Sequence, residues 1–174
     1  MDDAVLIQHV RKNADAFATL YRRYLTSVYR YLYRRTGNVQ DAEDLTAQVF
    51  TTVLAGLTDN LYQERGYFVA WLFTIARRRT VDFYRQRPVE ELADPPTMAP
   101  KVWEGIEKRQ DLHHLAHLLS QLDEDRQELL RLRFSAGLSF AQIGQVDGRS
   151  EAAVKMAIYR TLDYLHAQWE VKND

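Results

Sequence analysis

The sequence has no cysteine, few glycines and prolines, and no long apolar run. Because none of its 174 residues is Cys, disulfides, thiolate metal sites and thiol redox switches are excluded. Only 7 Gly and 4 Pro are present, which favours helices over a turn-rich β fold. No stretch approaches the roughly 20 apolar residues of a membrane-spanning helix, and the acidic first residues do not resemble a signal peptide. We therefore expect a cytoplasmic protein that does not insert into a membrane.

The sequence also lacks the motifs of a catalytic or cofactor site. It contains no phosphate-binding Gly loop and no nucleophile elbow. His113 and His117 are four residues apart and suggest a metal pair, but the adjacent Glu of a zincin and a third ligand are missing. A surface helix is therefore the favoured interpretation of these histidines. We predict that the protein is not an enzyme and holds no metal or cofactor.

Charge is distributed unevenly along the chain. Residues 1–88 hold 13 Lys and Arg against 9 Asp and Glu, whereas residues 89–111 hold 3 against 6. A basic front half followed by an acidic segment indicates modules with different partners. Residues 89–100 also contain three of the four prolines and lack helical periodicity, so we predict a linker over 89–111.

Apolar residues recur three and four positions apart through most of the chain, which predicts an all-α fold. The first clear helix is expected over about 15–35, closed by Gly37. The second is expected over about 39–55, capped by Asn38 at its start and closed by Gly56 at its end.

The remaining helices are predicted from their ends. Residues 57–66 are expected to form a loop, and a third helix follows until Pro88 stops it. Beyond the linker, Asp125 and Glu128 resemble a capping box at the start of a further helix.

Residues 138–165 have the spacing of a helix-turn-helix unit. Ser139 and Gln142 are placed to cap a short helix, residues 147–149 form a Gly-containing turn, and Ser150 is placed to cap a longer helix. In such a unit the second helix presents its N-terminal residues to the major groove of DNA. The pattern alone is equally typical of an ordinary helical hairpin with a solvated outer face.

The third helix starts as an apolar segment and ends as a cluster of arginines. Five of the eleven residues from Arg77 to Arg87 are Arg. A helix that combines a buried face, guanidinium groups and aromatic rings suits nucleic acid, including unstacked single strands. The competing interpretation is a solvated charged face whose arginines pair with Asp41, Glu43 and Asp44.

Three stretches, taken together and in this order, resemble the bacterial alternative sigma factors of the extracytoplasmic-function (ECF) group. They are DAEDLTAQVF at 41–50, FVAWLFTIARRRTVDFYR at 68–85, and the helix-turn-helix pattern at 138–165. The resemblance extends over about residues 12–167. Any one of the three stretches alone would be weak evidence, but their combination is specific.

The resemblance implies a sigma factor that binds RNA polymerase core, recognises and melts promoter DNA, and directs promoter-specific initiation. It implies two small helical domains, sigma region 2 at 12–88 and sigma region 4 at 112–167, joined by a flexible linker over 89–111. It also implies contacts with both double- and single-stranded promoter DNA, and an anti-sigma factor as antagonist.

The resemblance further implies roles for three groups of residues. The polymerase-binding positions are Asp41, Glu43, Asp44, Leu45, Gln48 and Phe50. The positions for the downstream promoter element and its single strand are Tyr62, Arg65, Tyr67, Phe68, Trp71, Arg77, Arg78, Arg85 and Arg87. The positions for the upstream promoter element are Arg149, Ser150, Glu151, Ala153, Lys155 and Arg160.

Two other functions remain open at this point. The chain is also compatible with a polymerase-independent helix-turn-helix regulator that binds duplex DNA as a dimer. A pure protein-interaction module with solvated arginines is the third possibility. Both leave the arginine-rich helix and the DAEDL run without a role, so the sigma factor is the preferred hypothesis.

Overall fold

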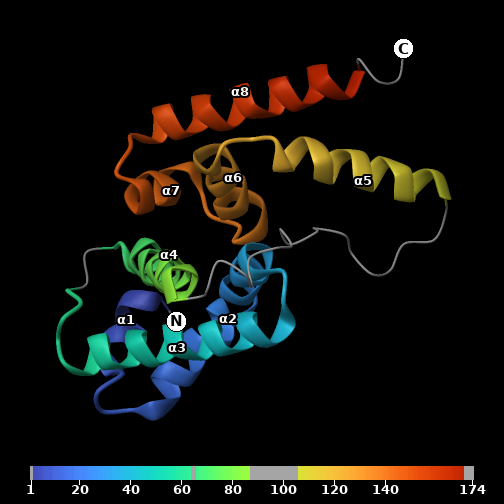
Figure 1. Cartoon of the computed structure of the whole chain (residues 1–174). Coiled ribbons are helices and arrows are strands. Elements are labelled where there is room, and N and C mark those ends of the chain that lie inside the picture. Colours follow the sequence, from blue (N-terminus) through green and yellow to red (C-terminus); the bar gives the residue numbers. More distant parts are fainter. Residues whose placement is uncertain (1, 64–65, 87–105, 171–174) are drawn as a thin grey trace.

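The computed structural model describes residues 2–63, 66–86 and 106–170, and these residues form helices and no strand (Figure 1). The first four helices make one module and the later helices a second module, which packs above the first in Figure 1. The prediction of an all-α fold is therefore confirmed. The elements are α1 (Asp3–His9), α2 (Ala14–Thr36), α3 (Val39–Thr58), α4 (Phe68–Gln86), α5 (Ile106–Ser120), α6 (Glu124–Leu130), the short π-helix η2 (Arg131–Ser135), α7 (Phe140–Asp147) and α8 (Glu151–Glu170).

Local sequence signals set the helix ends of the first module. The side chain of Asn13 accepts a hydrogen bond from the Asp15 amide at the start of α2, and Asn38 does the same for the Asp41 amide in α3. Gly37 ends α2 with a φ of 65°, a left-handed conformation that Gly adopts without strain.

The predicted end of α3 at Gly56 is wrong, because the helix continues through this residue to Thr58. A Cβ added at Gly56 would lie 2.8 Å from the Trp71 ring. Gly56 therefore serves close packing of α4 against α3, and not helix termination.

The predicted linker lies largely outside the described residues. The structure resumes at Ile106, and residues 106–111 form the start of α5. The helix-turn-helix unit consists of α7 and α8, whose α7 begins with a complete capping box between Ser139 and Gln142.

The second expected capping box, from Asp125 to Glu128, is wrong. Asp123 caps α6 instead, because its side chain accepts a hydrogen bond from the Arg126 amide. Glu128 is 4% exposed and points toward the first module, where Tyr31 donates a hydrogen bond to it.

The turn between α7 and α8 depends on a second closely packed glycine. A Cβ at Gly144 would lie 2.6 Å from the backbone oxygen of Arg149, which cannot rotate away as a side chain would. We expect Gly144→Ala to lower the free energy of unfolding by about 1–3 kcal/mol, the usual cost of overpacking. Urea unfolding measures this, with the exposed Gln145→Ala as control. An unchanged midpoint for Gly144→Ala would contradict this account of the turn.

The two modules share one continuous core. The buried apolar residues form a single cluster that contains Tyr31 and Phe73 from the first module and Leu132 and Ile143 from the second. Between the modules, α4 packs on α7 and α2 packs on η2. The modules are thus in direct contact, which the sequence did not indicate.

Candidate nucleic-acid and protein interfaces

The acidic stretch of α3 presents three polar side chains to solvent. Glu43, Asp44 and Gln48 are exposed, and together we call them the α3 acidic face. Asp41 is partly buried in the first turn of the helix. The acidic face is therefore available to a basic partner surface.

Two other residues expected to bind polymerase are inside the protein. Leu45 is 2% exposed and Phe50 is 4% exposed. The Phe50 ring lies edge-on to Tyr21, with 4.7 Å between centroids. In this conformation Leu45 and Phe50 hold α3 against α2, and they offer no side-chain surface to a partner.

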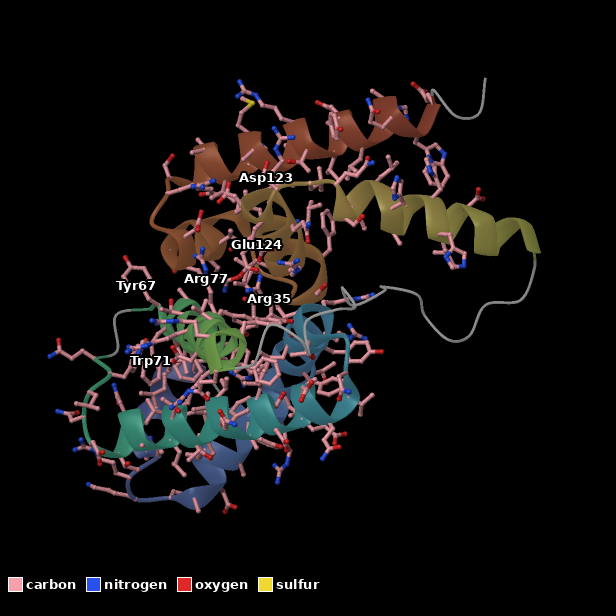
Figure 2. All side chains as sticks on the ribbon, viewed as in Figure 1. Arg35, Tyr67, Trp71, Arg77, Asp123 and Glu124 are labelled. Carbon is pink, nitrogen blue, oxygen red and sulfur yellow. The ribbon has the colours of Figure 1, made fainter. Side chains whose placement is uncertain are left out.

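Aromatic residues gather where the loop after α3 meets the start of α4. We call Tyr62, Tyr67, Phe68 and Trp71 the aromatic corner. The Tyr62 ring lies 4.6 Å from Trp71 and 5.8 Å from Phe68, between centroids. Phe68 is 3% exposed, whereas Tyr67 is 51% exposed and lies at the outer end of α4 (Figure 2). Tyr67 is thus the ring of this corner that is best placed to stack on an unpaired base.

Sequence reasoning missed one apolar residue beside the aromatic corner. Leu61 is 77% exposed, although it is a large aliphatic residue. Its signal was a lone apolar residue in the polar loop sequence TDNLYQERG. Arg65, which sequence reasoning placed in this group, lies outside the described residues.

The arginines of α4 fall into distinct environments. Arg79 is partly buried and donates to the Thr52 hydroxyl at 2.8 Å, so it ties α4 to α3. Arg77 pairs with Asp147 of α7 at 3.0 Å. Arg78 and Arg85 are exposed. These two are therefore the arginines of α4 best placed to contact phosphate. Arg87 lies outside the described residues.

The start of α8 combines a capped helix end with exposed side chains. The Ser150 hydroxyl accepts a hydrogen bond from the Ala153 amide at 3.2 Å. Arg149 forms ion pairs with Asp125 at 2.6 Å and Asp147 at 2.9 Å. The remaining candidates for the upstream element all lie exposed on α8: Glu151, Ala153, Lys155 and Arg160.

Neither a metal site nor a membrane span is found in the described part of the chain. No group of three or more His, Cys, Asp or Glu side chains there is arranged to hold a metal ion. Among the described helices, none is long and apolar enough to span a membrane.

Two family models match the chain, one in each module. Sigma-70 region 2 matches residues 20–88, and Sigma-70, region 4 matches residues 112–165. The first match includes the α3 acidic face, the aromatic corner and the arginines of α4. The second includes the whole helix-turn-helix unit except the last turns of α8.

Curated relatives and one solved structure agree with the two family models. The ECF RNA polymerase sigma factor BldN of Streptomyces coelicolor is 34% identical over 86% of this chain, which spans 58% of that protein's length. RNA polymerase sigma factor CarQ of Myxococcus xanthus is 32% identical, with 87% of each chain covered. The structure of CnrH in complex with the cytosolic domain of CnrY has the same fold, with a TM-score of 0.70, 24% identity, and coverage of 98% of this chain and 97% of that one. This chain therefore belongs to the ECF group of RNA polymerase sigma factors.

Proposed function

We propose that this chain binds RNA polymerase core and directs it to specific promoters, with each module contacting a different promoter element. The observation that carries the proposal is the presence of sigma regions 2 and 4 in one chain, in that order. The role is that of an initiation factor that acts in the cytoplasm with polymerase, and not that of a catalyst.

The α3 acidic face is the proposed contact with polymerase. Glu43, Asp44 and Gln48 form a polar, largely anionic surface that suits a basic partner. Leu45 and Phe50 contribute indirectly, because their burial fixes the orientation of α3.

The proposed contact with melted promoter DNA runs from the aromatic corner along the exposed side of α4. Tyr67 offers a ring for stacking, while Arg78 and Arg85 offer charges to the phosphates. At the upstream element, the N-terminal half of α8 is proposed to enter the major groove, where Lys155 and Arg149 are placed to reach phosphate or guanine.

An anti-sigma factor is the proposed antagonist. The similar fold of CnrH was solved in complex with the cytosolic domain of CnrY. Such a partner would block this chain by covering the surfaces for polymerase or DNA.

Capture of bacterial RNA polymerase core by the purified chain tests the proposed function. We expect stoichiometric capture, followed by promoter-dependent transcription from the reconstituted complex. A chain that binds duplex DNA tightly alone and leaves active core behind would favour the polymerase-independent regulator. That alternative is not favoured, because a region 2 match covers most of the first module.

The exposed arginines of α4 give a second test. We expect Arg78→Ala combined with Arg85→Ala to spare capture of polymerase core but to weaken open-complex formation. Each lost phosphate contact should also make the log–log salt dependence of DNA binding shallower by about one unit. Titrations at several salt concentrations measure this slope.

The control for this variant removes two arginines from another helix. Arg22 and Arg30 are exposed on α2, so Arg22→Ala with Arg30→Ala makes the same change in net charge. Equal losses in the two double variants would show that total charge, and not the face of α4, controls binding to DNA.

A further inference from the structure

Glu128 lies at the centre of a polar contact between the two modules. It is 4% exposed on α6, and the Tyr31 hydroxyl of α2 donates to its carboxylate at 2.5 Å. Arg35 of α2 lies 3.2 Å from the same carboxylate, and Arg131 lies 3.3 Å from it. Figure 2 shows Arg35 and Glu124 facing each other where the modules meet. We call Tyr31, Arg35, Glu124, Glu128 and Arg131 the inter-module latch.

Two of the groups that satisfy Glu128 come from the other module. A buried carboxylate is costly unless it is paired and hydrogen-bonded. Arg131 belongs to the same module as Glu128, but Tyr31 and Arg35 do so only while the modules touch. Burial, followed by the nearby Glu128 charge, raises the pKa of Tyr31 well above its usual value, so the phenol remains a donor.

The outer part of the latch is also charged and complementary. Arg35 and Arg131 both form ion pairs with Glu124, and the Tyr84 hydroxyl donates to the backbone oxygen of Arg35. Partial burial opposes ionisation of Glu124, but Arg131 and Arg35 outweigh this effect and lower its pKa. The latch carboxylates are matched by two arginines, so the contact is specific for this arrangement of the modules.

The latch is suited to reversible opening. When the modules separate, water replaces the lost partners of Glu128 and removes the penalty of burying its charge. A buried polar contact of this kind contributes little net stability, because desolvation offsets most of its attraction. It specifies the closed arrangement without making that arrangement permanent.

A second contact joins two of the proposed DNA-binding surfaces. The side chain of Asp147 is 8% exposed and pairs with Arg77 of α4 at 3.0 Å. The same carboxylate pairs with Arg149, next to α8, at 2.9 Å. One buried carboxylate thus neutralises an arginine from each DNA-binding surface, while α4 and α7 pack together.

We propose that the inter-module latch holds the free protein in a closed form that withholds its DNA-binding surfaces, and that the latch opens before both modules engage a promoter. This inference rests on the proposed function for its DNA partner. The Glu128-centred contact specifies the closed form, and the Asp147 pairs make it inhibitory. Polymerase core, whose proposed α3 contact stays exposed in the closed form, is thereby able to bind first.

Fluorescence energy transfer on the full chain tests the closed form. The chain has no Cys, so Thr51→Cys and Ala167→Cys place two labels on exposed residues of the two modules. Glu128→Lys puts a third positive charge beside Arg35 and Arg131, and we expect it to lower transfer. The control is the exposed Asp111→Lys on α5, which makes the same change in net charge and should leave transfer unchanged.

Binding to a mixed-sequence DNA duplex at low salt measures the inhibition. We expect Glu128→Lys to bind about tenfold more tightly than Asp111→Lys, the change expected if the wild-type open form is about 10% populated. Equal transfer in the wild-type chain and Glu128→Lys would overturn the closed form. Lower transfer with no gain in DNA affinity over Asp111→Lys would overturn the inhibition.

Tyr31→Phe keeps the test decisive if Glu128→Lys fails to fold. It removes only the hydroxyl and keeps the ring that packs edge-on to Phe73 at 5.7 Å. We expect a smaller decrease in transfer, and unchanged transfer in this variant would count against the latch. Failure of the wild-type chain to capture polymerase, with these transfer differences intact, would overturn the proposed function and leave the latch standing.

Discussion

A chain that carries Asp44→Arg and Gln48→Arg is expected to fold normally and to lose capture of RNA polymerase core. Both side chains are exposed on α3, so their replacement leaves the buried face of the helix unchanged. Two arginines would face a basic partner surface, and like-charge contacts across an interface cost several kcal/mol. We expect the affinity for core to fall by at least about 100-fold, which corresponds to about 2.7 kcal/mol.

A matched control for this variant exists on the other module. Asp163 and Gln168 are exposed on α8, so Asp163→Arg with Gln168→Arg repeats the same two substitutions away from α3. Core affinity is measured by titrating labelled chain with polymerase, and folding by the urea midpoint. If the α3 variant is folded and binds core as tightly as the α8 variant, the α3 acidic face is not the polymerase contact.

Local signals predicted the helix-turn-helix unit well. Ser139 and Gln142 form the capping box that their spacing indicated, and Gly148 ends α7 with a φ of 73°. Val154 and Ile158 are buried on the inner face of α8, as their four-residue spacing indicated. These features depend on residues within one or two helical turns, which a single sequence displays directly.

Features that depend on distant residues were not predictable in the same way. Glu128 has the position of a capping residue in the sequence, but its partner Tyr31 is 97 residues away. Gly56 has the appearance of a helix end, yet it makes room for Trp71 of the next helix. In both cases a tertiary contact outweighs the local preference, and no sequence pattern names the partner.

The surface roles of α3 were partly accessible from periodicity alone. Phe50 follows Val49 directly, so on a helix it lies about 100° from the most buried position and still falls within the apolar stripe. Its 4% exposure agrees with that placement. Periodicity thus separates Phe50 from the exposed Asp44 and Gln48, even though all three lie in the stretch that resembles the family.

The aromatic corner divides into rings that support and a ring that is free to bind. Phe68 is buried, and Trp71 packs on Gly56 and on Tyr62. Replacing either Phe68 or Trp71 would remove core packing together with any contact to DNA. Tyr67 is 51% exposed at the outer end of α4, so its replacement separates the two effects.

Tyr67→Ala is expected to retain its fold and its capture of polymerase core while losing most open-complex formation. Stacking of one base on an aromatic side chain contributes about 1–3 kcal/mol, so the loss should be about 5- to 150-fold. An extruded base has lost its stacking within the duplex, and the Tyr67 ring would replace that contact. Open complexes are measured with a fluorescent base analogue placed in a promoter from which the wild-type complex initiates.

Tyr67→Phe distinguishes stacking from hydrogen bonding in this experiment. The ring remains and only the hydroxyl is lost, so near-normal melting of the promoter is expected if stacking is the contribution of Tyr67. A loss in Tyr67→Phe as large as in Tyr67→Ala would assign the effect to the hydroxyl. Normal melting in both variants would remove Tyr67 from the DNA contact, and the exposed Leu61 would then be the next side chain of this corner to replace.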